Sequence, residues 1–360
     1  MYVSIVTMPV ANLRNLCRCG SHGKNFTFIA KRYATTHSTR GYRIWTSRQA
    51  RWSTKSSQKP SLEPVEGLFG STSADSGTVP LSRLWKPFVF TIAFSGASLA
   101  GAAIWQYENL RQRAINSMRL PLNWAQERSI MPKKGKWRQE LNKWWSNLSE
   151  GERLFFPLCF VNCLVFLAWR VPSFQNFMVR YFCSNPASRA LCWPMVLSTF
   201  SHYSAFHLFA NMYVLHSFST GAVASLGKEQ FLGLYLSAGV ISSMASYVYK
   251  ALTSQPGLSL GASGAIMAVL GYVCTQYPDT RLSIIFLPVL SFTAGSAIKV
   301  IMALDATGVL LGWKFFDHAA HLGGALCGIA WCYWGNAYIW QKREPLLHWW
   351  HELRSSAPTK

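Results

Sequence analysis

Seven long apolar runs, separated by polar segments, dominate the amino-acid sequence. Each run is close to the roughly 20 residues that an α-helix needs to cross a bilayer. An α-helix satisfies its own backbone hydrogen bonds, which makes it the usual structure for crossing lipid. The runs therefore predict an all-α polytopic membrane protein with seven transmembrane helices, at residues 88–105, 154–169, 195–219, 231–252, 258–277, 282–304 and 315–334.

The composition excludes several other classes of protein. Of the 360 residues, 50% are hydrophobic and only 14% are charged, whereas an ordinary soluble domain has about 25% charged residues. The net charge of +21 comes mostly from the N-terminal third and from the segment after Gln106, which argues against one nucleic-acid-binding patch. The nine cysteines lack the paired spacing of zinc ligands. We expect no metal site, no small-molecule cofactor and no nucleic-acid partner.

The N-terminal segment has the composition of a targeting sequence. Residues 1–60 contain no Asp or Glu, while Arg and Lys recur among Ser, Thr and apolar residues. This pattern is typical of a mitochondrial transit peptide, and a disordered basic tail is the alternative. Import through a transit peptide predicts an N-terminus in the matrix.

The polar segments divide the rest of the chain. A linker-like stretch precedes the first apolar run. A basic segment that includes Trp137, Trp144 and Trp145 follows the run, and this composition is typical of a helix that lies on the membrane surface. The other six runs are close together. The predicted parts are a linker at 61–84, an extra N-terminal transmembrane helix at 85–107, a basic amphipathic connection at 108–152, a six-helix core at 153–340 and a C-terminal tail at 341–360.

Polar side chains within the apolar runs are candidate functional groups, because a polar group inside a bilayer is costly. Ser263 falls in the first turns of its helix, where free N–H groups and the helix dipole favour a developing oxyanion. Taken singly, each such residue is equally typical of an interhelical hydrogen bond. The candidates are His202, His207, Asn211, Ser263, His318 and His321.

Small residues accompany two of these candidates. Gly261 and Gly264 flank Ser263, while Gly324 and Gly328 follow His321 at helical spacing. Two helices with such small residues at their contact can approach closely, which would bring a serine hydroxyl within ~3 Å of an imidazole. The alternative is that small residues line a close helix contact that carries no chemistry.

Three motifs, in their helix order, resemble the rhomboid intramembrane serine proteases: His-Leu-Phe-Ala-Asn at 207–211, Gly-Ala-Ser-Gly-Ala at 261–265 and Ala-His-Leu-Gly-Gly at 320–324. Ser-His-Tyr at 201–203 and the stretch 315–321 resemble the mitochondrial members of that family. The resemblance implies a six-helix rhomboid core, transmembrane protein substrates and a place in the mitochondrial inner membrane. It also implies site roles: Ser263 as nucleophile, His321 as its base, and His207 and Asn211 as oxyanion donors.

The sequence departs from the family pattern in places. Bacterial members carry a tyrosine four residues after the serine, where this chain has Met267, whose thioether can still contact the imidazole. His318 is an alternative base, but its position beside Asp317 and the lack of a glycine one turn later assign it to the membrane interface. No acidic third member is apparent near either motif. The resemblance also implies a movable gate, formed by the sixth span and the following loop at 305–313.

The sequence therefore predicts a serine endopeptidase that uses a Ser-His dyad to cleave single-span membrane proteins in contact with membrane lipid. A catalytically silent rhomboid-like scaffold is one alternative, which is disfavoured because Ser263 and His321 are both present. A transporter with a polar midplane site is another, which is disfavoured because no paired repeats or intramembrane carboxylates are evident.

Overall fold

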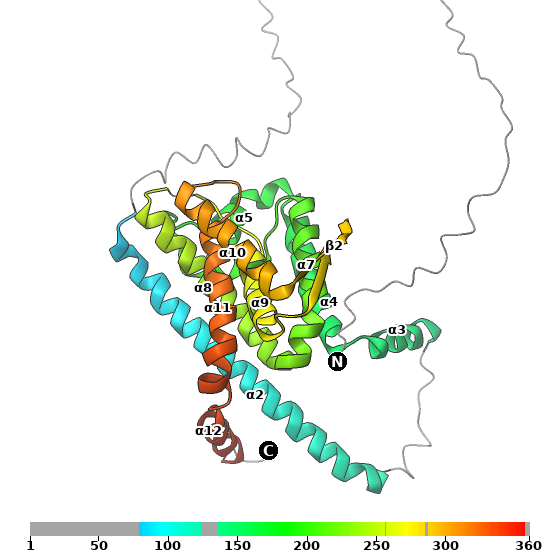
Figure 1. Cartoon of the computed structure of the whole chain (residues 1–360). Helices are drawn as coiled ribbons and strands as arrows, with labels where there is room; N and C mark the ends of the chain where they lie inside the picture. Colours follow the sequence, from blue (N-terminus) through cyan, green and yellow to red (C-terminus); the bar gives the residue numbers. More distant parts are fainter. Residues whose placement is uncertain (1–78, 124–134, 256, 285–286, 357–360) are drawn as a thin grey trace, which may run out of the picture. The chain divides into compact units, whose positions relative to one another are not determined.

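The described part of the chain is almost entirely helical (Figure 1). The computed structural model describes residues 79–123, 135–255, 257–284 and 287–356, so the predicted transit peptide at 1–60 lies outside it. The helices are α2 (Trp85–Asn123), α3 (Lys136–Asn147), α4 (Glu150–Ala168), α5 (Gln175–Phe182), α6 (Cys192–Leu197), α7 (Ala205–Leu226), α8 (Lys228–Leu252), α9 (Ser263–Gln276), α10 (Ala294–Leu311), α11 (His318–Ala330) and α12 (Glu344–Ser355). Shorter elements are the 3-10 turns η1 (Leu81–Leu84), η3 (Pro172–Phe174) and η4 (Ser198–Phe200), the π-helix η5 (Trp331–Trp340) and the strands β1 (Arg281–Ile284) and β2 (Leu287–Thr293).

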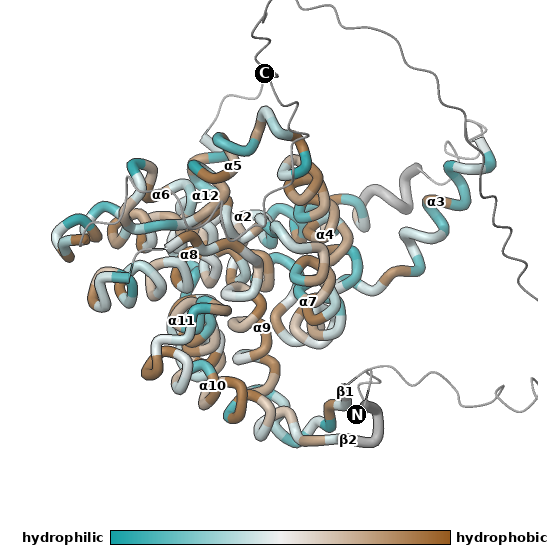
Figure 2. Tube along the Cα trace, turned by 90° about the horizontal axis from the view of Figure 1, so that it is seen from above, coloured by the Kyte–Doolittle hydropathy of each residue, from teal (hydrophilic) through white to brown (hydrophobic). Residues whose placement is uncertain are grey.

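Four helical segments in the described residues are long and apolar enough to cross a membrane: Leu81–Met118, Glu150–Ala168, Lys228–Leu252 and Ala294–Leu311. The third of these, α8, is the most enclosed, since 67% of its apolar window is buried inside the protein. The other three are 17–22% buried and expose apolar side chains, as a lipid-facing helix does. Figure 2 shows this as hydrophobic colouring along α4 and α10, and more hydrophilic colouring along α3.

Helix α9 forms the centre of the core, in contact with α7, α8, α10 and α11. It is apolar but has only 14 residues, and it is buried continuously from Gly264 to Cys274. Its closest neighbour is α11. A Cβ atom on Gly324 would fall on the carbonyl oxygen of Gly264, and one on Gly328 would fall on that of Ala268. The two helices therefore touch backbone to backbone, as their small residues predict.

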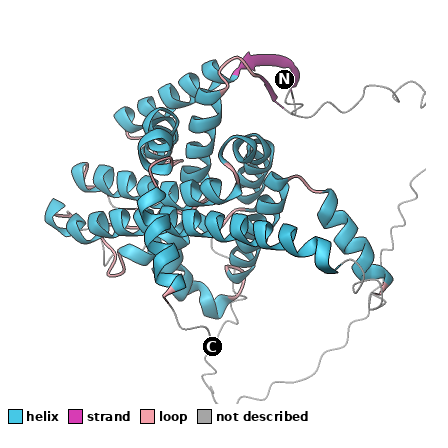
Figure 3. Ribbon diagram, turned by 90° about the horizontal axis from the view of Figure 1, so that it is seen from below, coloured by secondary structure: helices cyan, strands magenta, loops and turns pink. Residues whose placement is uncertain are grey.

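The start of the predicted sixth span is not helical. Strands β1 and β2 pair antiparallel, with Arg281 opposite Thr293, at the edge of the helices (Figure 3). Pro288 and the β-branched and aromatic residues around it favour strand over helix. The helix begins only at Ala294, where the Thr293 hydroxyl caps it, and continues to Leu311. The prediction of a loop over 305–313 is therefore wrong for most of that segment.

Two other predicted spans have different bounds. The run 195–219 is not one helix: it begins in α6, continues through η4 and a short link, and ends within α7. Ser204 is the N-cap of α7, so this helix begins only at Ala205. Helix α7 then runs to Leu226 and ends at Gly227, whose φ of 82° suits glycine. The last run continues from α11 through η5 to Trp340.

The helices α2 and α12, near the two ends of the described chain, pack against each other. Helix α2 lies along α8, and α12 contacts α2 through Glu108, which accepts hydrogen bonds from Trp350 and Arg354. Helix α3, in the predicted amphipathic connection, has no buried residue. Its Trp144 lies 5.1 Å from the ring of Phe156 on α4.

Candidate active site

Ser263 is the first residue of α9, and the loop before it is held in place by backbone hydrogen bonds. Ser259 pairs with Ser184 through two N–H to C=O bonds of 2.8 and 2.9 Å, and Gly261 N–H donates to the carbonyl of Ser198 at 2.9 Å. Gly261 has φ of 133°, a conformation that L-residues rarely adopt, and a Cβ there would lie 2.8 Å from the imidazole of His207. Only glycine fits the position that turns the chain into α9.

The Ser263 hydroxyl faces a histidine from the neighbouring helix. Its Oγ lies 2.9 Å from Nε2 of His321, which is in the first turn of α11. The close contact between Gly264, which follows Ser263, and Gly324, one turn after His321, allows this approach. A hydroxyl and an imidazole at this distance can exchange a proton.

A carboxylate lies on the other side of that imidazole. Nδ1 of His321 is 3.2 Å from Oδ1 of Asp305, a residue of α10. The sequence shows no acidic third member near either motif, and the structure brings Asp305 to His321 from the separate helix α10. Asp305 is only 5% exposed, so this carboxylate is enclosed by protein.

His207 and Asn211 share a face of α7, but their side chains differ in surroundings. The His207 imidazole lies beside Gly261, next to Ser263. The Asn211 amide donates instead to the backbone carbonyl of His207 at 2.9 Å, within its own helix. His202 packs edge-on against His207 with ring centroids 5.0 Å apart, and its Nε2 accepts from Ala262 N–H at 3.3 Å.

The residues described above lie within a segment that matches known proteins. The family model "Rhomboid domain" matches residues 189–336. The proteins named "Presenilin-associated rhomboid-like protein, mitochondrial" of Mus musculus and Homo sapiens are each 56% identical to this chain over 283 residues, which is 78% of this chain and 74% of theirs. This chain belongs to the rhomboid family. The rhomboid is also 32% identical to "Rhomboid protease GluP" of Bacillus subtilis over 140 residues, 38% of this chain and 24% of that protein.

His318 of this rhomboid, which was predicted to lie at the membrane interface, is enclosed by protein. It is 7% exposed, and its Nδ1 lies 2.7 Å from the same Asp305 oxygen that faces His321. Gly308 on α10 makes room for the imidazole, since a Cβ there would lie 2.5 Å from the ring. The local sequence does not reveal this burial, because the room for His318 comes from a different helix.

Asp317 ties the start of α11 to the loop before Ser263. Its carboxylate accepts from Ala320 N–H at 3.0 Å, from the hydroxyls of Ser246 and Ser259, and lies 3.3 Å from Lys250 Nζ. Asp317 lies in the link between α10 and α11, outside both helices. Burial raises its pKa, but Lys250 and these donors outweigh burial and lower the pKa to about 2. The carboxylate is therefore ionised and holds the rhomboid's two motif-bearing segments together.

An aromatic ring flanks the imidazole of His321, although the chain has no tyrosine one turn after Ser263. The ring of Phe316 lies 6.2 Å from that of His321 at 33°. Met267, which was expected to contact the imidazole, is buried in α9 one turn after Ser263. The residue pattern did not identify Phe316, because its contact depends on how the link before α11 folds back.

The ligand atoms of Asp305, His318 and His321 lie within 4.8 Å of one another, a spacing that a metal ion could bridge. The atoms that face each other already make the 2.7 and 3.2 Å hydrogen bonds. A metal would have to replace both of these protons, so the donor set as it stands fits hydrogen bonding better than metal coordination.

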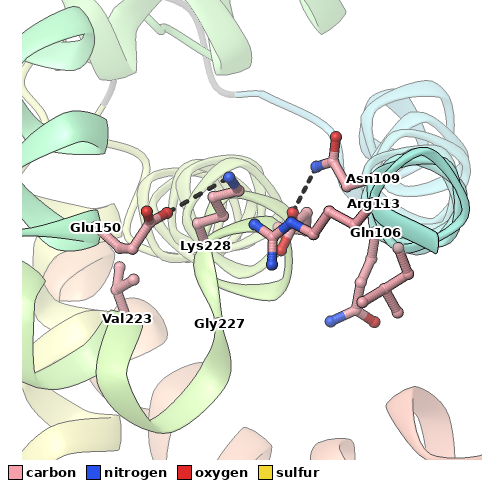
Figure 4. A pocket seen from close by; sticks show the side chains of 9 residues that line it. Gln106, Asn109, Arg113, Glu150, Val223, Gly227 and Lys228 are labelled. Atoms are coloured by element: carbon pink, nitrogen blue, oxygen red, sulfur yellow. Dashed lines mark hydrogen bonds and ion pairs between the residues drawn. The ribbon is translucent and has the colours of Figure 1, made fainter. Parts of the chain in front are cut away.

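Two cavities border the rhomboid's described residues. A small one of about 30 Å³ lies next to Ser263 and is lined by hydroxyls such as those of Ser242 and Ser246. A larger one of about 300 Å³ lies between α2 and the α7–α8 turn, and Figure 4 shows its charged lining. There Lys228 pairs with Glu150 at 3.4 Å, and Asn109 donates to Glu229 at 2.7 Å. The lining residues of this larger cavity do not include a serine or a histidine, in contrast to the surroundings of Ser263.

Proposed function

We propose that this rhomboid is an intramembrane serine protease that cleaves single-span membrane proteins. The observation that carries the proposal is the 2.9 Å distance between Ser263 Oγ and His321 Nε2, two partly buried side chains on neighbouring helices. A nucleophile and a base within hydrogen-bonding reach are the minimum that acyl transfer requires. The similarity to a protein named as a rhomboid protease supports the same reaction class.

In the proposed reaction, His321 Nε2 takes the Ser263 proton while Oγ attacks the carbonyl carbon of the scissile peptide bond. The resulting oxyanion would accept a hydrogen bond from the backbone N–H of Ser263. This N–H has no acceptor within the helix, because Ser263 is the first residue of α9. His207 and Asn211 are the proposed side-chain donors, and the Asn211 amide must rotate away from the His207 carbonyl to act. The His321 imidazolium then protonates the leaving amine, and water activated by His321 hydrolyses the acyl-enzyme.

The proposed membrane arrangement has seven spans, the extra helix α2 followed by α4, α7, α8, α9, α10 and α11 with η5. Its proposed location is the mitochondrial inner membrane, with residues 1–60 as the import signal and the N-terminus in the matrix. The relatives named as mitochondrial support this location. Substrate helices would reach Ser263 from the surrounding lipid.

The test uses the full-length chain in proteoliposomes with a model single-span membrane protein. Wild-type protein is expected to cut the model substrate and to be labelled at Ser263 by a fluorophosphonate. Ser263→Ala and His321→Ala should each lower the cleavage rate by roughly 1,000-fold or more, because both act in one proton-transfer step.

Matched controls are Ser217→Ala on α7 and His348→Ala on the exposed face of α12, and both should cleave at the wild-type rate. A protein that binds the substrate helix, yields no product and leaves Ser263 unlabelled would be a silent scaffold, and the proposal would fail.

A further inference from the structure

Asp305 occupies an unusual position for a carboxylate. It is 5% exposed, on a helix long and apolar enough to span a membrane. Oδ1 contacts both His318 Nδ1 and His321 Nδ1, and Oδ2 has no partner among the described residues. Burying an ionised carboxylate is costly unless its hydrogen bonds compensate. The two imidazoles are the groups that retain Asp305 in this place.

The contact with Asp305 determines which nitrogen of His321 carries the proton. A carboxylate accepts, so Nδ1 of a neutral His321 must hold its hydrogen toward Oδ1. This leaves the lone pair on Nε2, the atom that faces Ser263 Oγ at 2.9 Å. The opposite tautomer would present N–H to the hydroxyl and could not take its proton.

His318 fixes the carboxylate rather than competing as a base. Its 2.7 Å bond to Asp305 is the shorter of the two, and its ring is held between Gly308 and the rings of Trp313 and Phe315. Its other nitrogen, Nε2, is buried beside Gly308 and has no partner in the described part of the chain. The nitrogen that could act as a base is therefore directed at α10 and not at Ser263.

We propose that Asp305 is a positioning residue for the reaction of Ser263 and His321, and that His318 anchors Asp305; this inference rests on the proposed function. The serine proton passes from Oγ to Nε2 of His321, and Asp305 takes no proton. Its negative charge orients the imidazole and stabilises the imidazolium that forms. The site is thus a chain of four residues, His318, Asp305, His321 and Ser263, contributed by three helices.

The first test is Asp305→Asn, which keeps the shape of the side chain and removes its charge. We expect kcat for the model substrate to fall about 100-fold or more, since the equivalent change in a soluble serine protease costs ~10⁴-fold. KM and Tm should stay close to wild-type values, because the substrate-binding surface is unchanged. Asp279→Asn, at an exposed carboxylate, is the matched control and should leave kcat unchanged.

The second test separates anchoring from base catalysis at His318. Asn at this position retains an N–H donor near the place of Nδ1, whereas Leu does not. His318→Asn is expected to keep kcat within about 10-fold of wild type, and His318→Leu to lose as much as Asp305→Asn. Equal loss in both variants, with Tm unchanged, would overturn the anchoring role.

The third test shows whether Asp305 acts through His321. In a His321→Ala background, adding Asp305→Asn should not slow fluorophosphonate labelling of Ser263 any further, because the group that it positions is already absent. A further loss of the same size as in the wild-type background would overturn the inference.

The outcomes distinguish this inference from the proposed function. If wild-type protein neither cleaves nor is labelled, the proposed function fails and the inference falls with it. If wild type cleaves, Ser263→Ala does not, and Asp305→Asn turns over within about threefold of wild type per folded molecule, the protease stands and the role of Asp305 is wrong. Lower Tm and yield with normal turnover of the folded fraction would also overturn that role, since Asp305 would then be structural.

Discussion

His207 is the side chain best placed to stabilise negative charge beside Ser263, because its imidazole lies against Gly261. Asn211 lies one turn further on, with its amide bound to the carbonyl of His207. This difference predicts that the two proposed oxyanion donors contribute at different stages. His207 is in place before substrate arrives, whereas Asn211 must exchange one hydrogen bond for another.

Removing either donor should slow turnover without weakening substrate binding. Loss of one such donor in a soluble protease costs roughly 100- to 1,000-fold in kcat. We expect a fall of that order for His207→Ala and a smaller one for Asn211→Ala, whose amide first has to leave a hydrogen bond within α7. Steady-state kinetics per folded enzyme provide the measurement. Wild-type kcat combined with a lowered Tm would instead show that both residues only support helix packing.

At single positions, the sequence was most informative where a polar residue stood inside an apolar run. Ser263 and His321 could be selected in this way, together with the glycines that let their helices meet. Asp305 was missed because it lies just past the apolar run that ended at 304, where helix α10 continues for about two more turns, to Leu311. The contact of His318 with Asp305 was missed because its surroundings, Gly308 and Trp313, come from segments that pattern alone cannot bring together.

Among the helices, the contact between α9 and α11 sets the geometry of the proposed dyad. Gly324→Ala would put a methyl group onto the Gly264 carbonyl and push the two helices apart. Overpacking of this kind typically costs about 1–3 kcal/mol. We expect a lower Tm in detergent and a lower cleavage rate, because Ser263 and His321 lie on these two helices.

The matched control is Gly101→Ala on α2, where nothing lies within 4 Å of the added methyl group. This substitution should leave Tm unchanged or raise it slightly, since alanine favours a helix over glycine. An unchanged Tm in Gly324→Ala would mean that the two helices can separate at no cost, contrary to the close contact in the structure.

Hydropathy predicted which segments form long helices better than it predicted where those helices begin and end. The runs identified the positions of α2, α4, α8 and α10, because twenty apolar residues have few alternatives in lipid. The pairing of β1 with β2 was missed, since the residues of these strands are as apolar as those of a helix. Whether an apolar stretch forms paired strands or a helix depends on its tertiary contacts, and a hydropathy pattern gives no information about those contacts.

For the whole molecule, we expect residues 1–60 to serve mitochondrial import alone and the described helices to serve cleavage alone. Replacing 1–60 with an unrelated mitochondrial presequence is expected to restore both mitochondrial location and cleavage, because the segment is proposed to carry import information only. Fractionation and the cleavage assay provide the measurements, and deletion of 1–60 without replacement is the control. Finding Met1 on the mature membrane form would contradict the proposal.

Three different helices build the proposed site of this rhomboid, so the site is complete only when all three are in place. Ser263 comes from α9, His321 and His318 from α11, and Asp305 from α10. A displacement of α10 by about 1 Å would stretch the 3.2 Å contact with His321 beyond useful hydrogen-bonding range. In a molecule opened between α10 and α11, the imidazole of His321 would therefore lose the contact with Asp305 that orients it. The proposed peptide-bond cleavage would begin only after the two helices had closed again around the substrate.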